Sequence, residues 1–350
     1  MESARLTKDF EELFSADKSW IEKLNGKSVL VTGATGLIGS VLSKAILYYN
    51  ENCDGKIDLI CAVRNHEKAE IVFGDAAKAI FLVFDVMQKP EYSGNVDYII
   101  HTANTTSSLD YVNKPVETIT TIISGTKNML DFALEKKVEN FVYLSSMEVY
   151  GSPNPNKDRI EETDSGYINT MSVRSSYSEG KRLAECLCAS YAKEFGLKTV
   201  VARLAQVFGA GVPETDNRVF MQLCKSAISK TDFVMHSDGS SYGNYCYTTD
   251  AVKALLMLLT DGAAGEAYNV VNEENTSTIK NMAEMVSLDI AGGAFKVVYD
   301  IPDSDLKYGY APKVKMHLSS KKINALGWQA TVSLKEMYVR LLEYINERKK

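Results

Sequence analysis

Residues 29–39 read Val-Leu-Val-Thr-Gly-Ala-Thr-Gly-Leu-Ile-Gly and place glycines at positions 33, 36 and 39. A strand-like apolar run, residues 28–32, precedes the glycines, and a helical pattern, residues 37–49, begins among them. In such a unit the first glycine allows a tight turn, the second lets the backbone approach a pyrophosphate, and the third lets the helix pack closely on the strand. We therefore predict a dinucleotide-binding loop formed by Gly33, Thr35, Gly36, Leu37, Ile38 and Gly39.

Strand-like and helical segments alternate beyond this loop. Further apolar runs lie at 57–63, 79–84, 98–102, 141–145 and 199–204, with helical patterns at 116–136 and 178–195 between them. This alternation predicts an α/β fold: a Rossmann-type, doubly wound parallel sheet. We divide the chain into a short amphipathic helical extension (1–26), an NAD(P)-binding domain (27–205), and a segment (206–350) that forms mainly a smaller C-terminal α/β substrate-binding lobe. The lobe segment carries helical patterns at 218–229, 249–260, 278–290 and 333–348.

The composition narrows the class of protein. The 350 residues are 45% hydrophobic and 24% charged, which is typical of a globular protein and excludes a disordered, coiled-coil or collagen-like chain. A net charge of −6 gives no overall basic footprint, so we expect no nucleic-acid partner, although a local basic patch stays possible. Because no run approaches 18 apolar residues and the first 18 residues alternate charged and apolar types, we expect no membrane association and a cytoplasmic protein. The six cysteines form no C-x-x-C pair and no metal-ligand spacing is present, so we predict buried thiols and no metal site.

Other segments are predicted to contact the far edge of the cofactor. Asp85 and Val86 follow the third predicted strand, and Thr102 and Ala103 follow the fourth. The second strand ends in Cys61-Ala-Val-Arg64 without an acidic residue. Because an acid there binds the ribose hydroxyls of NAD and an arginine pairs with the extra phosphate of NADP, Arg64 favours NADP, while NAD held by backbone contacts stays open.

A tyrosine and a lysine lie one helical turn apart in Tyr177-Ser-Glu-Gly-Lys181. A neighbouring ammonium favours phenolate, so we expect Lys181 to lower the pKa of Tyr177 and to make it a proton donor and acceptor near neutral pH. Ser146, at the end of the strand-like run 141–145, could donate a hydrogen bond to a substrate oxygen beside the Tyr177 hydroxyl.

Together these motifs resemble one enzyme group. The segments T-G-A-T-G-L-I-G, S-S-x-E-V-Y-G, Y-x-x-x-K and R-L-x-x-V-F-G are similar to those of the extended short-chain dehydrogenases/reductases of the nucleotide-sugar epimerase/dehydratase group, over about residues 27–275. The resemblance implies that Tyr177 is the general base and acid, that Lys181 also holds the nicotinamide ribose, and that Ser146 orients the reacting oxygen. It also implies hydride transfer from a sugar carbon, usually C4, and a homodimer formed through the helices at 116–136 and 178–195.

The chain departs from this group at three points, one of which is that Gln206 and Gln222 align with the substrate-side asparagines of the family. Met147-Glu148 replaces the Asp-Glu pair of the dehydratases, which disfavours 4,6-dehydration, while Glu148 keeps the position of the base. The stretch from Arg174 to Glu185 is similar to UDP-glucuronate decarboxylases, which have Arg and Glu at the positions of Arg174 and Glu148. Gly243 stands where such enzymes carry the arginine that binds the nucleotide diphosphate, so Arg218 or a lysine replaces it, or the substrate differs. The substrate contacts that the resemblance implies are Thr105, Glu148, Arg174, Gln206, Arg218, Gln222 and Tyr245.

These assignments leave structural alternatives open. Glu148 could be a structural acceptor for Arg174, and Tyr245 could be a packing residue. We expect an NAD(P)-dependent enzyme that modifies a nucleotide-activated sugar through a transient keto-sugar, by epimerisation or decarboxylation, with Glu148 beside the catalytic Ser146, Tyr177 and Lys181. An NADPH-dependent reductase of a keto-sugar or nucleotide-linked ketose is the alternative, and a catalytically inactive, cofactor-binding regulator is the alternative from another class.

Overall fold

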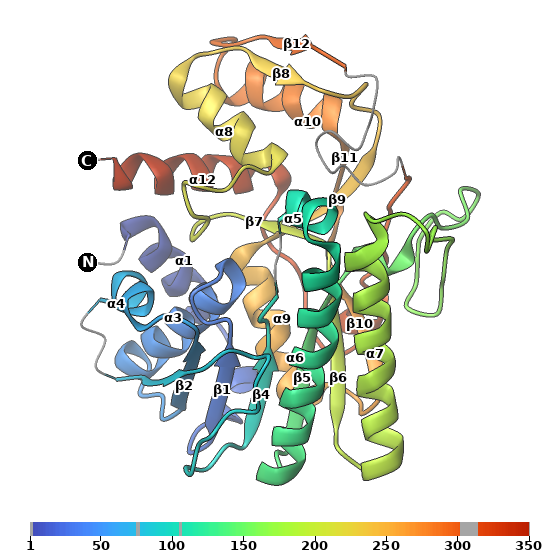
Figure 1. Ribbon diagram of the computed structural model, residues 1–350. Coiled ribbons are helices and arrows are strands. Elements are labelled where there is room, and N and C mark those ends of the chain that lie inside the picture. Colours follow the sequence, from blue (N-terminus) through green and yellow to red (C-terminus); the bar gives the residue numbers. More distant parts are fainter. Residues whose placement is uncertain (1–2, 75–77, 105–106, 302–313, 350) are drawn as a thin grey trace.

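A single parallel sheet forms the centre of the molecule (Figure 1). The computed structural model describes residues 3–74, 78–104, 107–301 and 314–349. All pairs of neighbouring strands in the seven-stranded sheet are parallel. In spatial order the strands are β10 (Glu266–Val270), β6 (Thr199–Leu204), β5 (Asn140–Ser146), β4 (Tyr98–His101), β1 (Ser28–Thr32), β2 (Asp58–Val63) and β3 (Ile80–Val83).

The strand order reverses between β1 and β4. From β1 the chain proceeds outward to β2 and β3, then crosses back to β4 and continues the other way through β5 and β6. In doubly wound sheets ligands bind at the carboxyl ends of the strands at such a reversal, and the predicted glycine loop lies there, between β1 and α3. The predicted Rossmann-type fold is therefore confirmed.

Helices cover both faces of the sheet because the strands are apolar on both sides. In β1, Val29 and Val31 pack into one core cluster and Leu30 into the other. The first cluster includes α3 (Leu37–Asn52) and α9 (Thr248–Asp261), and the second includes α6 (Pro115–Lys136) and α7 (Ser175–Phe195). Two short helices, α4 (His66–Phe73) and α5 (Ser108–Asn113), follow β2 and β4.

A smaller lobe lies above the carboxyl ends of the strands (Figure 1). It holds a three-stranded sheet, β11-β9-β7, and a parallel pair, β12-β8. Its elements are β7 (Gln206–Phe208), α8 (Val219–Ser229), β8 (Phe233–Met235), β9 (Tyr242–Tyr247), β11 (Asn272–Thr278), α10 (Ile279–Met285), the π-helical turn η2 (Val286–Ile290), β12 (Val297–Tyr299) and α12 (Leu334–Arg348). The short helix α11 (Lys321–Asn324) packs against β10 of the central sheet. We assigned the segment beyond residue 205 mainly to the lobe. In the structure, β10 of that segment belongs to the central sheet, and α9 covers the sheet.

The N-terminal extension packs against the C-terminal helix. Its helices are α1 (Ala4–Phe14) and α2 (Ser19–Glu22), and their apolar side chains, including Phe10, Phe14 and Trp20, are buried in the first core cluster. Asp9 is fully buried and accepts hydrogen bonds from Arg5 (2.8 Å), Arg340 of α12 (2.8 Å) and the Tyr247 hydroxyl (2.6 Å). The extension therefore joins α12 to the end of β9.

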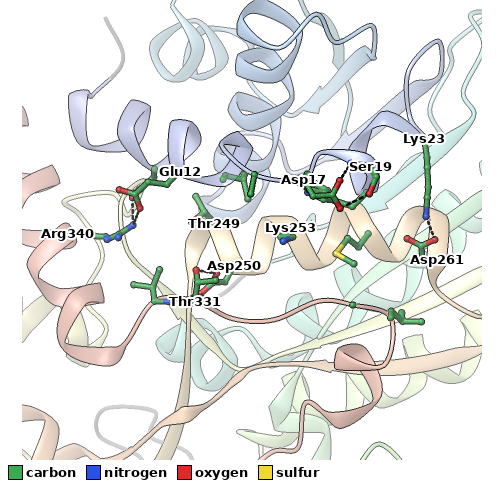
Figure 2. A pocket seen from close by; sticks show the side chains of 18 residues that line it. Glu12, Asp17, Ser19, Lys23, Thr249, Asp250, Lys253, Asp261, Thr331 and Arg340 are labelled. Carbon is green, nitrogen blue, oxygen red and sulfur yellow. Dashed lines mark hydrogen bonds and ion pairs between the residues drawn. The ribbon is translucent and has the colours of Figure 1, made fainter.

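A cavity of about 370 Å³ lies beside this junction (Figure 2). Its walls come from α1, α2, α9 and residues 326–332, and none of its lining residues is a predicted site residue. In the described part of the chain, no helix is both long and apolar enough to cross a membrane.

Candidate active site

The glycine loop between β1 and α3 has room for backbone only. Gly33 has a φ of +64°, and a Cβ there would lie 2.9 Å from the Cα of Ala103; at Gly39 a Cβ would lie 2.3 Å from the Gly33 carbonyl oxygen. Gly36 is the N-cap of α3 and offers no side-chain acceptor to the first-turn N–H groups of Leu37, Ile38 and Gly39. A 16-residue helix thus presents its positive end at a concave backbone turn, which suits the pyrophosphate of a dinucleotide.

The end of β4 is tied to the end of β1 beside this loop. Thr32 Oγ1 accepts the backbone N–H groups of Thr102 (3.1 Å) and Ala103 (3.2 Å) and lies 2.8 Å from His101 Nδ1. Burial, with a smaller effect of Lys181, lowers the pKa of His101 to about 3, so its imidazole is neutral. These bonds place Thr102 and Ala103 against Gly33, as the sequence predicts for cofactor contacts.

Asn104 adds a feature that suits a bound cofactor. Both polar atoms of its amide are buried without a hydrogen-bond partner among the described residues. A buried amide with no partner is costly, and a polar ligand group at this edge would offset that cost. The tight backbone turn at Gly33 and Gly39, together with this buried amide, therefore suits the binding of a dinucleotide.

The remaining predicted cofactor residues lie at the carboxyl ends of β2 and β3. Arg64 directly follows β2 and is exposed. Asp85 is exposed and its carboxylate accepts the N–H of Met87 (2.9 Å), whereas Val86 is buried against Gly125 of α6. These three residues lie at the carboxyl-terminal edge of the sheet, and the glycine loop lies at the same edge.

Ser146, Tyr177 and Lys181 come together at the end of β5. Ser146 is the last residue of that strand, and its Oγ accepts the N–H of Glu148 in the 3-10 turn η1 (Met147–Tyr150). Tyr177 and Lys181 lie one turn apart near the start of α7 and are only 7% and 2% exposed. The Ser146 hydroxyl is near enough to Tyr177 to lower the pKa of its phenol.

The pKa of Tyr177 is raised in this structure, against the prediction that Lys181 lowers it. Burial, and to a smaller extent Glu148, raise the pKa of Tyr177 to about 12, against the lowering effects of Ser146, Tyr111 and Arg174. Lys181 is not among these main causes; its Nζ donates to the Leu144 carbonyl oxygen (2.6 Å) and lies 5.8 Å from the centre of the Tyr177 ring. Burial lowers the pKa of Lys181 itself to about 7, so its ammonium is only about half populated at neutral pH.

Glu148 and Arg174 form an ion pair next to Tyr177. The Arg174 guanidinium donates two hydrogen bonds of 3.0 Å to the Glu148 carboxylate, and Ser178 Oγ donates a third of 3.1 Å. The structure thus matches the alternative in which Glu148 is an acceptor for Arg174. The pair nevertheless borders the catalytic residues, and the Glu148 side chain is 23% exposed.

The predicted substrate residues of the lobe are less closely grouped. Gln206 begins β7 and is half-buried. Arg218 precedes α8 and binds the Asp216 carboxylate through two nitrogens, while the exposed Gln222 donates to the Asn217 carbonyl oxygen (2.6 Å). Thr105 lies outside the described residues.

Tyr245 is a core residue, which corrects the expectation that it contacts substrate. Its side chain is 0% exposed and packs edge-on against Phe208, with ring centres 5.9 Å apart. A Cβ at Gly243 would lie 2.9 Å from the Tyr245 hydroxyl oxygen. The glycine in place of the expected arginine therefore makes room for this buried tyrosine.

Tyr111 is a site residue that sequence reasoning missed. It belongs to α5, is 3% exposed, and stacks on Tyr177 with ring centres 4.3 Å apart and planes 11° apart. A single aromatic residue in a short segment between two predicted elements carries no signal of this contact. No group of three or more potential metal ligands is found among the residues that the structure describes.

Comparison with known proteins identifies similar sequences and folds. The model of a family described as "NAD dependent epimerase/dehydratase family" matches residues 29–272. The chain is 28% identical over 320 residues to UDP-glucuronic acid decarboxylase 6 of Arabidopsis thaliana, covering 88% of this chain and 85% of the relative. It is 25% identical over 350 residues to UDP-glucuronic acid decarboxylase 1 of Xenopus tropicalis, covering 98% and 77%.

Solved structures share the whole architecture. UDP-glucose 4-epimerase of Thermotoga maritima, solved with UDP-glucose, matches with a TM-score of 0.77 at 22% identity, covering 92% of this chain and all of the other. The dTDP-glucose 4,6-dehydratase of Bacillus anthracis, solved with NAD, matches with a TM-score of 0.74 at 18% identity, covering 93% and 98%. At these identities the likeness shows a common fold.

Proposed function

Because the chain belongs to the NAD-dependent epimerase/dehydratase family of extended short-chain dehydrogenases/reductases, we propose that it modifies a nucleotide-activated sugar by a closed redox cycle. The sugar is oxidised to a transient ketone, epimerised or decarboxylated, and reduced again. The observation that carries this proposal is the meeting of Ser146, Tyr177 and Lys181 at the end of β5, beside the glycine loop.

Each residue has a distinct task in this cycle. A bound NAD(P) would supply the hydride acceptor for the sugar carbon and the hydride donor for the return step. The Gly33–Gly39 backbone and the α3 N-terminus would hold its pyrophosphate, and the Lys181 ammonium would hold the ribose hydroxyls. Tyr177 takes the proton of the sugar hydroxyl as hydride leaves and gives it back in the reverse step, while Ser146 donates a hydrogen bond to the same oxygen.

The similarity to UDP-glucuronic acid decarboxylases favours decarboxylation of a nucleotide-linked uronic acid. The Glu148–Arg174 pair supports this choice, because an arginine held beside the reacting centre can take up a sugar carboxylate when its bonds to Glu148 open. Epimerisation is the alternative outcome of the same cycle.

Arg64 supports a second candidate function. It stands exposed after β2 where no acidic residue follows the strand, so it can pair with the extra phosphate of NADP. An NADPH-dependent reductase of a keto-sugar would use the same three catalytic residues but would consume its cofactor.

Product analysis with a panel of nucleotide sugars tests the proposal. Purified protein is incubated with UDP-glucuronate, UDP-glucose and their dTDP counterparts in the presence of NAD or NADP, and products are identified by mass spectrometry and NMR. We expect conversion of at least one of these compounds. Tyr177→Phe, which keeps the ring and removes the proton-transferring hydroxyl, is expected to reduce turnover at least a hundredfold.

Two outcomes would contradict the proposal. If no nucleotide sugar is altered while dinucleotide binding is intact, the chain binds the cofactor for another purpose. If Tyr177→Phe retains full turnover, the assigned base is wrong.

A further inference from the structure

The backbone that follows β7 packs against the start of α3, the helix whose N-terminus lies at the glycine loop. A β-carbon at Gly211 would overlap Cγ2 of Val41 and lie 3.7 Å from Cδ1 of Leu37, so the Gly211 backbone is in direct contact with α3. Leu37 is the first residue of α3 and belongs to the predicted dinucleotide-binding loop. The position of residues 209–211 therefore bears on the part of α3 that would meet a pyrophosphate.

Ala210, between two glycines, is held at both of its backbone groups. Its N–H donates to the Tyr247 hydroxyl (3.4 Å), and its carbonyl oxygen accepts from Thr248 Oγ1 (3.0 Å). All three residues are fully buried. Gly209 lies against the Tyr247 ring, with which a β-carbon would collide. Because no water can replace the partners of these buried groups, the two bonds fix residues 209–211 in place.

The Tyr247 side chain is held in turn by the N-terminal extension. Its hydroxyl donates to the Asp9 carboxylate of α1 (2.6 Å), which also accepts from Arg340 of α12 (2.8 Å). The Arg340 guanidinium carbon lies 5.5 Å from the centre of the Tyr247 ring, and this guanidinium also pairs with Glu12 of α1 (2.8 Å; Figure 2). A continuous series of buried contacts thus leads from α1 through Tyr247 to residues 209–211 and on to the first turn of α3.

The extension also packs on α3 directly, but at another place. Phe10 and Phe14 contact Tyr48, which lies in the last two turns of that helix, with ring centres 5.7 Å and 6.0 Å apart. The direct packing therefore supports the far end of α3, whereas the route through Tyr247 leads to the end at the glycine loop.

We propose that Tyr247 is a positioning residue for cofactor binding, through which Asp9 of the N-terminal extension holds residues 209–211 against the first turn of α3. The extension is in this way a working part of the cofactor site. The effect on a bound dinucleotide rests on the proposed function, but the effect on residues 209–211 does not.

The substitution Tyr247→Phe tests the role of the hydroxyl, because phenylalanine keeps the ring. We expect affinity for NAD or NADP, measured by calorimetric titration, to fall about fivefold. Hydrogen–deuterium exchange of the cofactor-free protein, followed by mass spectrometry, should become faster in peptides that cover residues 209–211 and stay unchanged in those that cover β5. The matched control is Tyr338→Phe, which removes another buried tyrosine hydroxyl, one without a partner among the described residues, from α12. Its affinity and exchange should equal those of the wild type.

A double-mutant cycle tests whether the extension acts through this hydroxyl. Asp9→Asn removes the charge that Arg5 and Arg340 bind and weakens the acceptor of the Tyr247 hydroxyl. We expect it to weaken dinucleotide binding about threefold in the wild-type background and to have no further effect in Tyr247→Phe. A general loss of stability would instead act equally in both backgrounds.

The outcomes separate this inference from the proposed function. An unchanged affinity in folded Tyr247→Phe would overturn the inference, and so would equal effects of Asp9→Asn in the two backgrounds. If affinity falls as expected but no nucleotide sugar is converted, the proposed function fails and the inference stands.

Discussion

At the scale of single residues, burial decides the charge of the catalytic groups. It raises the pKa of Tyr177 to about 12 and lowers that of Lys181 to about 7, so burial shifts each group toward its neutral form. Two neutral groups are less costly to bury than a phenolate and an ammonium.

The low pKa of Lys181 predicts a specific dependence of stability on pH. An unfolded lysine has a pKa of about 10.4, so from about pH 7 to about pH 10 the unfolded chain binds more protons at this residue than the folded chain. The penalty for burying the ammonium is fully present below pH 7 and is relieved as the pH rises through that window. Relative to Lys181→Met, the wild type should gain about 2 kcal/mol in the free energy of unfolding between pH 7 and pH 9.

Urea unfolding of both proteins at pH 6, 7, 8 and 9 measures this difference. A constant difference across the series would show that the Lys181 ammonium is not destabilised by burial.

Residue-scale prediction from sequence succeeded for local motifs and failed for contacts between distant segments. Tyr177 and Lys181 could be placed together because helical spacing alone puts them on one face. Tyr111 and the core position of Tyr245 depend on which segments pack against one another, and no local pattern encodes this.

At the scale of elements, the turn from β1 to α3 is the most constrained part of the site. Gly33 packs against Ala103 and Gly39 against the Gly33 carbonyl, so these two positions have no space for a side chain. A β-carbon there must displace the turn that presents the first N–H groups of α3.

Gly39→Ala is therefore expected to weaken cofactor binding at least tenfold, because its Cβ would lie 2.3 Å from the Gly33 carbonyl oxygen. Gly196→Ala is the control: Gly196 has a φ of +70° but open space around it, so it should cost about 1 kcal/mol of stability and leave affinity unchanged. Calorimetric titration with the dinucleotide measures the affinity of each variant. Equal affinities in the two variants would contradict the role of Gly33 and Gly39 in cofactor binding.

Elements of the central sheet and the helices beyond residue 205 were predicted well, whereas the strands of the lobe were not predicted. The strands β1, β2, β4, β5 and β6 are apolar runs because they are buried on both faces, and periodicity detects them. In contrast, β11 (Asn272–Thr278) is polar and only partly buried, and β7, β8 and β12 have three residues each, too few for a pattern. Pairing with distant strands, rather than local sequence, defines these elements.

At the scale of the whole molecule, the two ends of the chain lie near each other (Figure 1), and a buried charge cluster links their helices α1 and α12. The Asp9 carboxylate accepts hydrogen bonds from Arg5, Arg340 and Tyr247. Ser3 Oγ donates a hydrogen bond to Glu347 near the other terminus (2.6 Å). The cluster links the N-terminal extension to both α12 and the lobe sheet.

Asp9→Asn should destabilise the protein by about 3 kcal/mol, because it leaves two arginines near a site that has lost its buried carboxylate. Glu11→Gln, at an exposed position of the same helix, should change stability by less than about 0.5 kcal/mol. Chemical denaturation compares the two, and equal losses would show that the cluster contributes no more than surface charge.

The protein is also predicted to be a homodimer formed through α6 and α7. These helices pack against each other and leave apolar side chains exposed, namely Val116, Ile119, Leu183 and Phe195. Light scattering should give twice the mass of one chain, and Leu183→Glu should reduce it to one, whereas Ile71→Glu on α4 should not. A wild-type protein that stays monomeric at micromolar concentration would contradict this prediction.

The central claim is a redox cycle that regenerates its own cofactor. The most direct test is the ratio of product formed to cofactor consumed when the nucleotide sugar is in large excess over a substoichiometric amount of NAD(P). The account predicts many product molecules per cofactor molecule and no lasting change in absorbance at 340 nm. Product that forms only in step with oxidation of NADPH would contradict the cycle and identify a reductase.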